Sequence, residues 1–195
     1  MRMIAPLLIL ASCLASPAQA EITVSNLFTD QMVLQHGKPV VVWGMAQEGE
    51  AVSVSIAGNS VSTRADAQGR WKTSLPALEP NSGPHQLVLE GTNRITISDV
   101  LVGEVWNCSG QSNMAFSVAA ANDPDLESLS AKYPGIRIIS IPQVGTQQPQ
   151  DNFQGSWDTV TPERVKHFSA VGYFFGRQLH QTLEMPLGLI DNARG

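Results

Sequence analysis

Residues 99–114 read DVLVGEVWNCSGQSNM, and this stretch decides the fold. Its first part, Val100 to Trp106, is a mainly apolar run that predicts a strand. Its second part holds Gly110 in a tight turn, and a segment with helical prospects follows. Strand, turn and helix in this order predict one unit of a parallel sheet that is covered by helices.

The chain after residue 114 continues the alternation of helices and strands. We expect a helix from Pro124 to Lys132, a strand from Ile136 to Ile141, a helix from Phe168 to Leu183 and a strand from Leu187 to Ile190. Residues 142–161, rich in Gln, Pro and Gly, predict a long surface loop. The apolar residues of the later helix recur at helical spacing and predict its buried face, made of Val171, Phe174, Phe175, Leu179 and Leu183.

The chain before residue 99 has the pattern of short antiparallel strands. Residues 51–56 alternate apolar and polar side chains, Gly58-Asn59 predicts a turn, and residues 61–64 predict the partner strand. Alternation continues through residues 87–97 without a helical stretch. We therefore predict an antiparallel β-sandwich module in residues 21–98, followed by an α/β domain with a parallel sheet in residues 99–195.

Residues 1–20 have the pattern of a secretory signal peptide. Arg2 precedes an apolar run from Ile4 to Leu14, and Ala18-Gln19-Ala20 forms a small-x-small cleavage site. We expect cleavage after Ala20 and a periplasmic or extracellular protein. Leu10 to Cys13 also fits a lipoprotein cleavage site, which gives lipid anchoring through Cys13 as the less favoured alternative.

Composition excludes several kinds of partner. The net charge of −5, with 17 acidic against 12 basic residues, argues against nucleic acid and anionic membranes as partners. No later stretch is apolar enough to span a bilayer, so we expect no membrane association after signal cleavage. Once Cys13 is removed, Cys108 is the one remaining cysteine and is expected to be a small buried residue of a strand.

Ser112 is the residue best placed for chemistry. It follows an apolar strand, where a hydroxyl is exposed and backbone N–H groups of the turn can face a developing oxyanion. Gly110 to Met114 resembles a G-x-S-x-G nucleophile turn, but Met114 replaces the second Gly. A serine that caps the next helix fits this position equally well on the residues alone.

The quoted stretch resembles the nucleophile block of the sialate O-acetylesterase family, carbohydrate acetylesterases with the SGNH-hydrolase fold. Residues 168–175 with 186–191 resemble the family's helix–strand pair, and residues 28–44 resemble its N-terminal β domain. Asn107 departs from the pattern, since an apolar residue usually precedes the cysteine. The resemblance implies that residues 99–195 form an SGNH-hydrolase-like domain, of which the C-terminal side is expected to be missing.

The resemblance implies hydrolysis of acetyl esters on sialic acid or a related glycan, with plant polysaccharides as a further substrate class. Ser112 would attack the acetyl carbonyl, activated by a histidine that a carboxylate orients. The oxyanion hole would use the Ser112 N–H, a glycine after the strand that ends near Asp191, and a downstream asparagine. Gly195 stands at that glycine position. No cofactor is implied, and no cluster with metal-ligand spacing predicts a metal site.

The family's Asn block and Asp-x-x-His block are not found in this sequence. None of the histidines has an aspartate three residues before it, and we expect surface or structural roles for His36, His85, His167 and His180. Asn122-Asp123 is better explained by capping of the helix at Pro124. We therefore expect the chain to be the N-terminal portion of a longer esterase and nearly inactive alone. The alternative is a non-catalytic, secreted β-sandwich protein that binds carbohydrate.

The tryptophans offer a weaker signal for sugar binding. Trp43, Trp71, Trp106 and Trp157 could stack on sugar rings, but burial in a core is the commoner fate of so few aromatic residues. The sequence alone therefore predicts packing roles for them.

Overall fold

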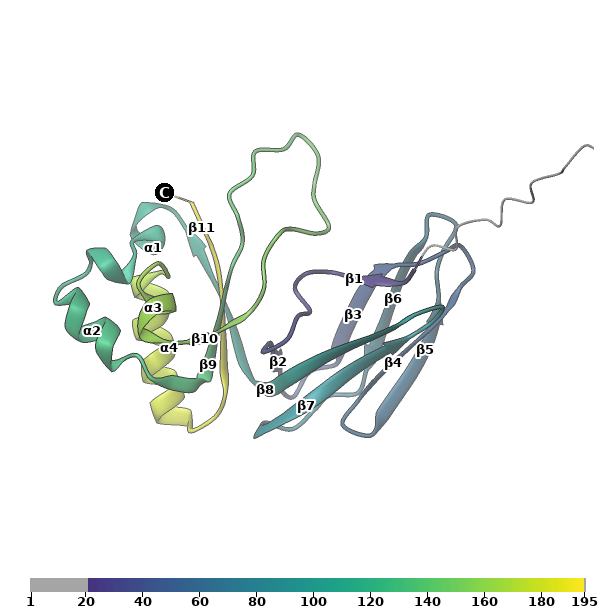
Figure 1. Ribbon diagram of the computed structural model, residues 1–195, viewed down its shortest axis with the longest axis horizontal. Helices are drawn as coiled ribbons and strands as arrows, with labels where there is room; N and C mark the ends of the chain where they lie inside the picture. Colours follow the sequence, from purple (N-terminus) through teal and green to yellow (C-terminus); the bar gives the residue numbers. More distant parts are fainter. Residues whose placement is uncertain (1–20, 195) are drawn as a thin grey trace, which may run out of the picture.

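The computed structural model describes residues 21–194, which form a β-sandwich and an α/β part side by side (Figure 1). A three-stranded sheet has the order β1-β3-β6, and a larger sheet has the order β10-β9-β11-β8-β7-β4-β5, with β2 also paired to β8. The strands are β1 Thr23–Val24, β2 Val33–Gln35, β3 Val40–Met45, β4 Ala51–Ile56, β5 Asn59–Arg64, β6 Arg70–Leu75, β7 Asn81–Glu90, β8 Arg94–Gly110, β9 Tyr133–Ser140, β10 Asp158–Val160 and β11 Leu187–Ala193.

The β-sandwich confirms the predicted antiparallel module. β4 pairs antiparallel with β5 and β7, and β3 pairs antiparallel with β1 and β6. The two sheets enclose one apolar core, which includes Val42, Val54, Trp71, Leu87 and Leu89. Alternation of apolar and polar residues along these strands produces this core, because one face of each strand points inward.

The hairpin between β4 and β5 forms where expected, but its turn lies one residue earlier. Ile56 pairs with Asn59, so the two turn residues are Ala57 and Gly58, with φ angles of 50° and 78°. Positive φ at both central residues is the geometry of the two-residue turn that matches strand twist. Asn59 therefore starts the second strand instead of lying in the turn.

The α/β part contains the predicted parallel sheet. β11 lies between β8 and β9 and pairs parallel with both, while β10 pairs antiparallel with β9 at the edge. The helices lie together on the sheet face that points away from the β-sandwich (Figure 1). They are α1 Ser112–Ala115, the 3₁₀ turn Val118–Ala120, α2 Pro124–Ser130, α3 Pro162–Val165 and α4 Ala170–Leu183.

The buried face of α4 differs from the prediction. Val171, Phe175 and Leu183 are 48%, 41% and 42% exposed, whereas the helix buries Ala170, Gly172, Tyr173 and Gly176. Two glycines allow this close approach. A Cβ atom at position 176 would lie 2.7 Å from Leu189, and one at position 172 would lie 2.8 Å from the Cys108 sulfur. The predicted face is therefore correct in part. Phe174 and Leu179 are partly buried and pack against the core, whereas Gly172 and Gly176 make the closest contacts in place of Val171, Phe175 and Leu183.

The expected cap of α2 is also different in detail. Asp123 is the N-cap residue, but it has a left-handed backbone (φ 49°) and its side chain makes no capping hydrogen bond. Its carboxylate accepts a hydrogen bond from Asn122 instead, at 2.9 Å. Pro124 starts the helix as predicted, and the helix ends at Ser130, before the expected Lys132.

One strand joins the two parts. The first part of β8 pairs antiparallel with β7, and its last seven residues, from Glu104, pair parallel with β11. Asp99, where we place the domain boundary, lies within this strand and has a φ angle of 55°. The buried Arg137 of β9 donates to both Asp99 carboxylate oxygens, at 2.8 and 3.2 Å. The division at residues 98 and 99 remains a prediction.

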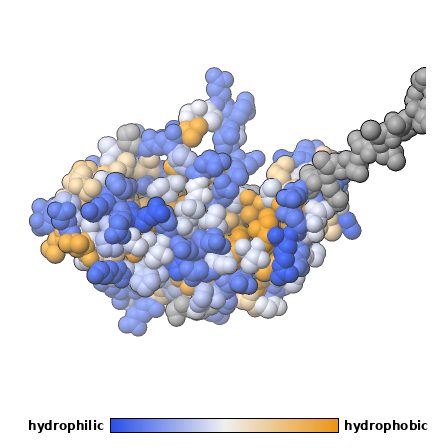
Figure 2. Space-filling model, viewed as in Figure 1, coloured by the Kyte–Doolittle hydropathy of each residue, from blue (hydrophilic) through white to orange (hydrophobic). Residues whose placement is uncertain are grey.

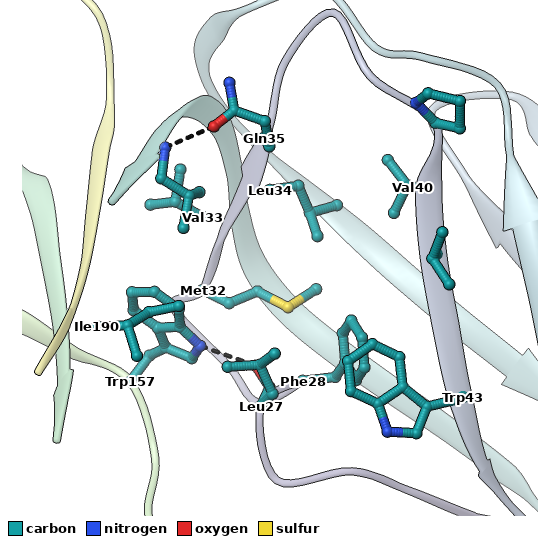
Figure 3. A pocket seen from close by; sticks show the side chains of 13 residues that line it. Leu27, Phe28, Met32, Val33, Leu34, Gln35, Val40, Trp43, Trp157 and Ile190 are labelled. Atoms are coloured by element: carbon teal, nitrogen blue, oxygen red, sulfur yellow. Dashed lines mark hydrogen bonds between the residues drawn. The ribbon is translucent and has the colours of Figure 1, made fainter. Parts of the chain in front are cut away.

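Aromatic and aliphatic side chains fill the junction between the two parts (Figure 3). The buried Trp157 donates from its indole N–H to the Leu27 carbonyl at 2.8 Å, and the Val105 N–H donates to the Gln35 side chain at 2.9 Å. These contacts surround an apolar cavity of about 180 Å³. The junction is therefore packed and hydrogen-bonded on both sides of β8.

The junction leaves no room for a side chain at Gly103. A Cβ atom there would lie 2.7 Å from the carbonyl carbon of Pro186, and the backbone cannot retreat because the Glu104 N–H donates to the Pro186 oxygen at 3.0 Å. We expect Gly103→Ala to lower the free energy of unfolding by about 1–3 kcal/mol, the usual cost of overpacking. Urea denaturation followed by circular dichroism measures this. Gly145→Ala, in open space, is the control, and an equal effect of both would contradict the prediction.

Candidate active site

Ser112 lies where strand β8 turns into helix α1. β8 ends at Gly110, whose φ angle of 148° favours glycine, and α1 begins at Ser112 itself. The side chain of Ser112 is exposed at the carboxyl end of the parallel strands. This is the edge of an α/β sheet at which ligands bind.

The structure argues against a capping role for Ser112. The N-cap of α1 is Gln111, whose carbonyl accepts from the Ala115 N–H at 3.0 Å. Ser112 is thus the first residue inside the helix, and its hydroxyl has no hydrogen-bond partner among residues 21–194. The interpretation of Ser112 as a helix cap was wrong, and its hydroxyl faces solvent. Its role as a nucleophile remains a prediction.

The end of β11 lies beside this turn. The Arg194 N–H donates to the Gly110 carbonyl at 2.8 Å, and the Ser109 hydroxyl donates to the Asn192 carbonyl at 3.5 Å. These bonds hold the two strand ends together. Gly195, the predicted oxyanion-hole residue, lies outside the described residues and remains a prediction.

Gln143 is a part of this edge that sequence reasoning missed. Its side-chain amide donates to the Ala193 carbonyl at 3.0 Å, so the long loop is attached to the end of β11. The sequence gives no signal for this contact, because the two residues are 50 positions apart in a Gln-rich segment.

Helix α4 is tied to α1 through its own cap. The Ser169 hydroxyl accepts from the Gly172 N–H at 3.0 Å and contacts the Met114 sulfur at 3.5 Å. The Ala170 N–H donates to the Phe116 carbonyl at 2.8 Å. The short helix that carries Ser112 is therefore fixed against a longer one.

Cys108 is a buried, free cysteine of β8, as predicted. Burial raises the pKa of its thiol to about 11, and the negative charge of the neighbouring Asp191 adds to this shift. The thiol is therefore protonated at neutral pH, which excludes it as a nucleophile there.

Asp191 is the charged residue closest in register to Cys108. Burial raises the pKa of its carboxyl group, and hydrogen bonds from the backbone N–H groups of Ala193 and Ser169 oppose that shift. The Ala193 N–H donates to Asp191 Oδ1 at 3.1 Å. Asp191 thus connects the end of β11 with the start of α4, beneath the turn that carries Ser112.

The structure does not join any histidine to Ser112 by a hydrogen bond within residues 21–194. His36 pairs with Glu104 at 2.8 Å, and His180 contacts the Met185 carbonyl at 2.7 Å. His85 belongs to β7, and His167 lies between α3 and α4. For His36 and His180 these contacts are structural, in line with the prediction.

In the part of the chain that the structure describes, no group of three or more His, Cys, Asp or Glu side chains is arranged to hold a metal ion. Within the same residues, no helix has the length and apolar character needed to cross a membrane.

Asp191 generates a prediction on stability. Because folding raises its pKa, the folded state is favoured most when the carboxyl is protonated, and stability falls as the pH rises from about 4 through the folded pKa. We therefore expect Asp191→Asn to increase the melting temperature more at pH 7 than at pH 4. Calorimetry at both pH values measures the difference. Asp151→Asn, in the exposed loop, is the control; an equal difference at both pH values for Asp191→Asn would refute the prediction.

Known proteins resemble this chain in sequence and in fold. Sialate O-acetylesterases of Mus musculus and Homo sapiens are each 30% identical to it over 88% of its length, and the matches cover 35% and 36% of those proteins. A carbohydrate acetylesterase of known structure from Xanthomonas citri is 35% identical, with a TM-score of 0.85 over 90% of this chain and 41% of that one. No protein-family model matches the sequence.

The chain spans about a third of the length of these curated relatives. Over that length the similarity includes the β-sandwich, the parallel sheet and the helices, since the structural match covers nearly all described residues. The resemblance found in residues 99–114 is therefore confirmed: over most of its length the chain is similar in sequence to sialate O-acetylesterases, and it is similar in fold to a carbohydrate acetylesterase.

Proposed function

We propose that this chain supplies the nucleophile of a serine esterase that removes O-acetyl groups from sialic acid or a related glycan. The observation that carries the proposal is the exposed, unbonded hydroxyl of Ser112 at the carboxyl end of β8. The names of the homologues, sialate O-acetylesterase and carbohydrate acetylesterase, support the same reaction.

The reaction follows from the position of Ser112. Its Oγ attacks the acetyl carbonyl carbon and passes its proton to a base, and the backbone N–H of Ser112 stabilises the oxyanion. The sugar oxygen leaves with a proton, and water then attacks the acetyl-serine ester and releases acetate. Gly195 is the second proposed oxyanion donor.

The general base belongs to another part of the protein in this proposal. Residues 21–194 bring no histidine into hydrogen-bond contact with Ser112, and the chain spans about a third of its relatives' length. We assign the base, and the carboxylate that orients it, to a part of the protein that corresponds to the region of the relatives not covered by this chain. The 195-residue chain alone should therefore have little activity.

The proposal includes export. Residues 1–20 lie outside the described residues, and their charge and apolar pattern support a signal peptide and a periplasmic or extracellular location.

Replacement of Ser112 tests the proposal. In the protein as its gene encodes it, we expect Ser112→Ala to reduce acetate release from O-acetylated sialic acid by about a thousandfold or more, because the covalent step is lost. Acetate release and labelling by a fluorophosphonate probe are the two readouts. Ser130→Ala, an exposed serine at the end of α2, is the control. Full activity in the Ser112→Ala variant, with an unchanged melting temperature, would disprove the assignment.

A further inference from the structure

Two open grooves meet beneath the long loop that follows β9. The first, which we name the loop groove, has a volume of about 650 Å³ and lies between residues 141–154 and the end of β11, Asn192 to Arg194. The second, the module groove, has a volume of about 550 Å³ and lies between residues 151–152 and strands β1, β3 and β6. Asn152 lines both grooves, so the two grooves adjoin at this residue, and we name the pair of grooves the path. Figure 1 shows this loop between the two parts of the molecule.

One end of the loop groove is formed by the end of β11, which is bonded to the turn that carries Ser112; Ser112 itself does not line the groove. Arg194 lines the loop groove, and its N–H donates to the carbonyl of Gly110, two residues before Ser112. Asn192 also lines the groove, and its carbonyl accepts a bond from the Ser109 hydroxyl. A molecule in the loop groove would therefore extend away from the turn that carries Ser112 toward the β-sandwich.

The middle of the path is held in place. Asn152 Oδ1 accepts hydrogen bonds from the Asn26 N–H at 2.8 Å and from the Phe153 N–H at 3.0 Å. The Asn26 side chain in turn donates to the Phe153 carbonyl at 2.5 Å. The loop is thus attached to the β-sandwich at the point where the two grooves join.

The loop groove has the chemistry of a hydroxyl-binding surface. Its side chains include four glutamines, at positions 143, 148, 150 and 154, and no acidic residue. Amide side chains both donate and accept hydrogen bonds, as sugar hydroxyls do. Among residues 21–194, the side chains of Gln148 and Gln154 have no hydrogen-bond partner, and both are exposed.

The module groove adds an apolar platform. Val41, Trp43 and Met45 occupy alternate positions of β3 and line the groove together; Val41 is 37% and Met45 is 47% exposed. Figure 2 shows an apolar patch on the β-sandwich at the side that faces the other part of the molecule. Arg70 and Lys72 of β6 flank the platform, with Asp66 paired to Arg70 at 3.3 Å. An aromatic and aliphatic floor between polar side chains suits the C–H faces and the hydroxyl edges of sugar rings.

We propose that this path binds the sugar units of an oligosaccharide whose acetylated unit lies at Ser112. The inference rests on the proposed function for the reacting end of the substrate. It adds that the substrate is a chain of several sugars and that the β-sandwich, through Trp43, contacts the units farthest from the ester. Mixed charges in the module groove and neutral amides in the loop groove oppose a nucleic acid as the occupant.

The test compares substrates of increasing length with the full-length protein. Mono-O-acetylated sialic acid oligomers of one to four units are the probes, and acetate release is the readout. We expect kcat/KM to rise with length in the wild type. Trp43→Ala should lower kcat/KM for the tetramer by about tenfold or less, the worth of one aromatic contact, and leave the monomer unchanged.

Trp43 also packs edge-on against the buried Phe28, at 4.8 Å between ring centroids, so its replacement can affect folding. The double variant Gln148→Ala/Gln154→Ala changes only exposed loop residues. Like Trp43→Ala, it should lower kcat/KM for the tetramer and leave kcat/KM for the monomer unchanged. Gln178→Ala/Gln181→Ala, on the exposed side of α4, is the matched control and should behave as the wild type.

A binding measurement separates this inference from the proposed function. Calorimetry with the unacetylated sialic acid tetramer and the Ser112→Ala variant measures binding along the path without turnover. Suppose that the tetramer binds, that the changes Gln148→Ala and Gln154→Ala weaken this binding, and that the wild-type protein releases no acetate. This result would support the sugar-binding path and disprove the esterase proposal. If acetate release does not depend on the length of the substrate and the tetramer does not bind, the esterase proposal is supported and the sugar-binding path is disproved.

Discussion

The structure depends on the backbone hydrogen bonds of one strand that belongs to two kinds of sheet. β8 offers one edge to β7 in antiparallel pairing and, farther along, another edge to β11 in parallel pairing. Asp99 lies at an irregularity in the pairing with β7 and has a left-handed backbone, a conformation that costs a non-glycine residue about 1–2 kcal/mol. Contacts around it offset this cost: Arg137 pairs with its carboxylate, and the Ser98 N–H donates to Asp30 at 2.6 Å. The β-sandwich, the parallel sheet and the position of Ser112 all follow from this strand.

The elements with strong local signals could be predicted from the sequence. The alternation of residues 51–56 and the apolar run of residues 187–190 correspond to β4 and to the start of β11. The buried face of α4 was predicted only in part by apolar spacing: Phe174 and Leu179 pack against the core, but Gly172 and Gly176 contribute contact through their small size, which the pattern does not reveal. Trp106 was expected to be buried, but it is 43% exposed and packs edge-on against Phe175 at 5.1 Å. Both differences concern how closely two elements approach, which a single sequence does not encode locally.

The candidate site, too, could be predicted only in part from the sequence. Ser112 could be found because its strand, turn and helix are contiguous and match a known motif. The surroundings of that turn come from distant parts of the chain. Ser169 of the α4 cap contacts Met114 of α1, and Gln143 and Asp191 bond to Ala193 in the neighbouring strand end. Their contacts depend on the sheet order β9-β11-β8, which side-chain patterns do not specify. Asn152 lines both grooves, and this position too depends on tertiary structure and not on the local sequence.

The continuity of β8 also limits how this protein can change during evolution. Seventeen strand residues at about 3.3 Å each give a contour length of roughly 55 Å, and the strand continues through a bend from one part to the other with no linker between them (Figure 1). Because side chains alternate along a strand, inserting or deleting one residue between Gly103 and Gly110 would move Cys108 to the opposite face of the sheet. The same change would shift the pairing with β11 by one position. Changes in length should therefore accumulate in the loop of residues 142–157, while the length of β8 stays constant among homologues that keep both parts.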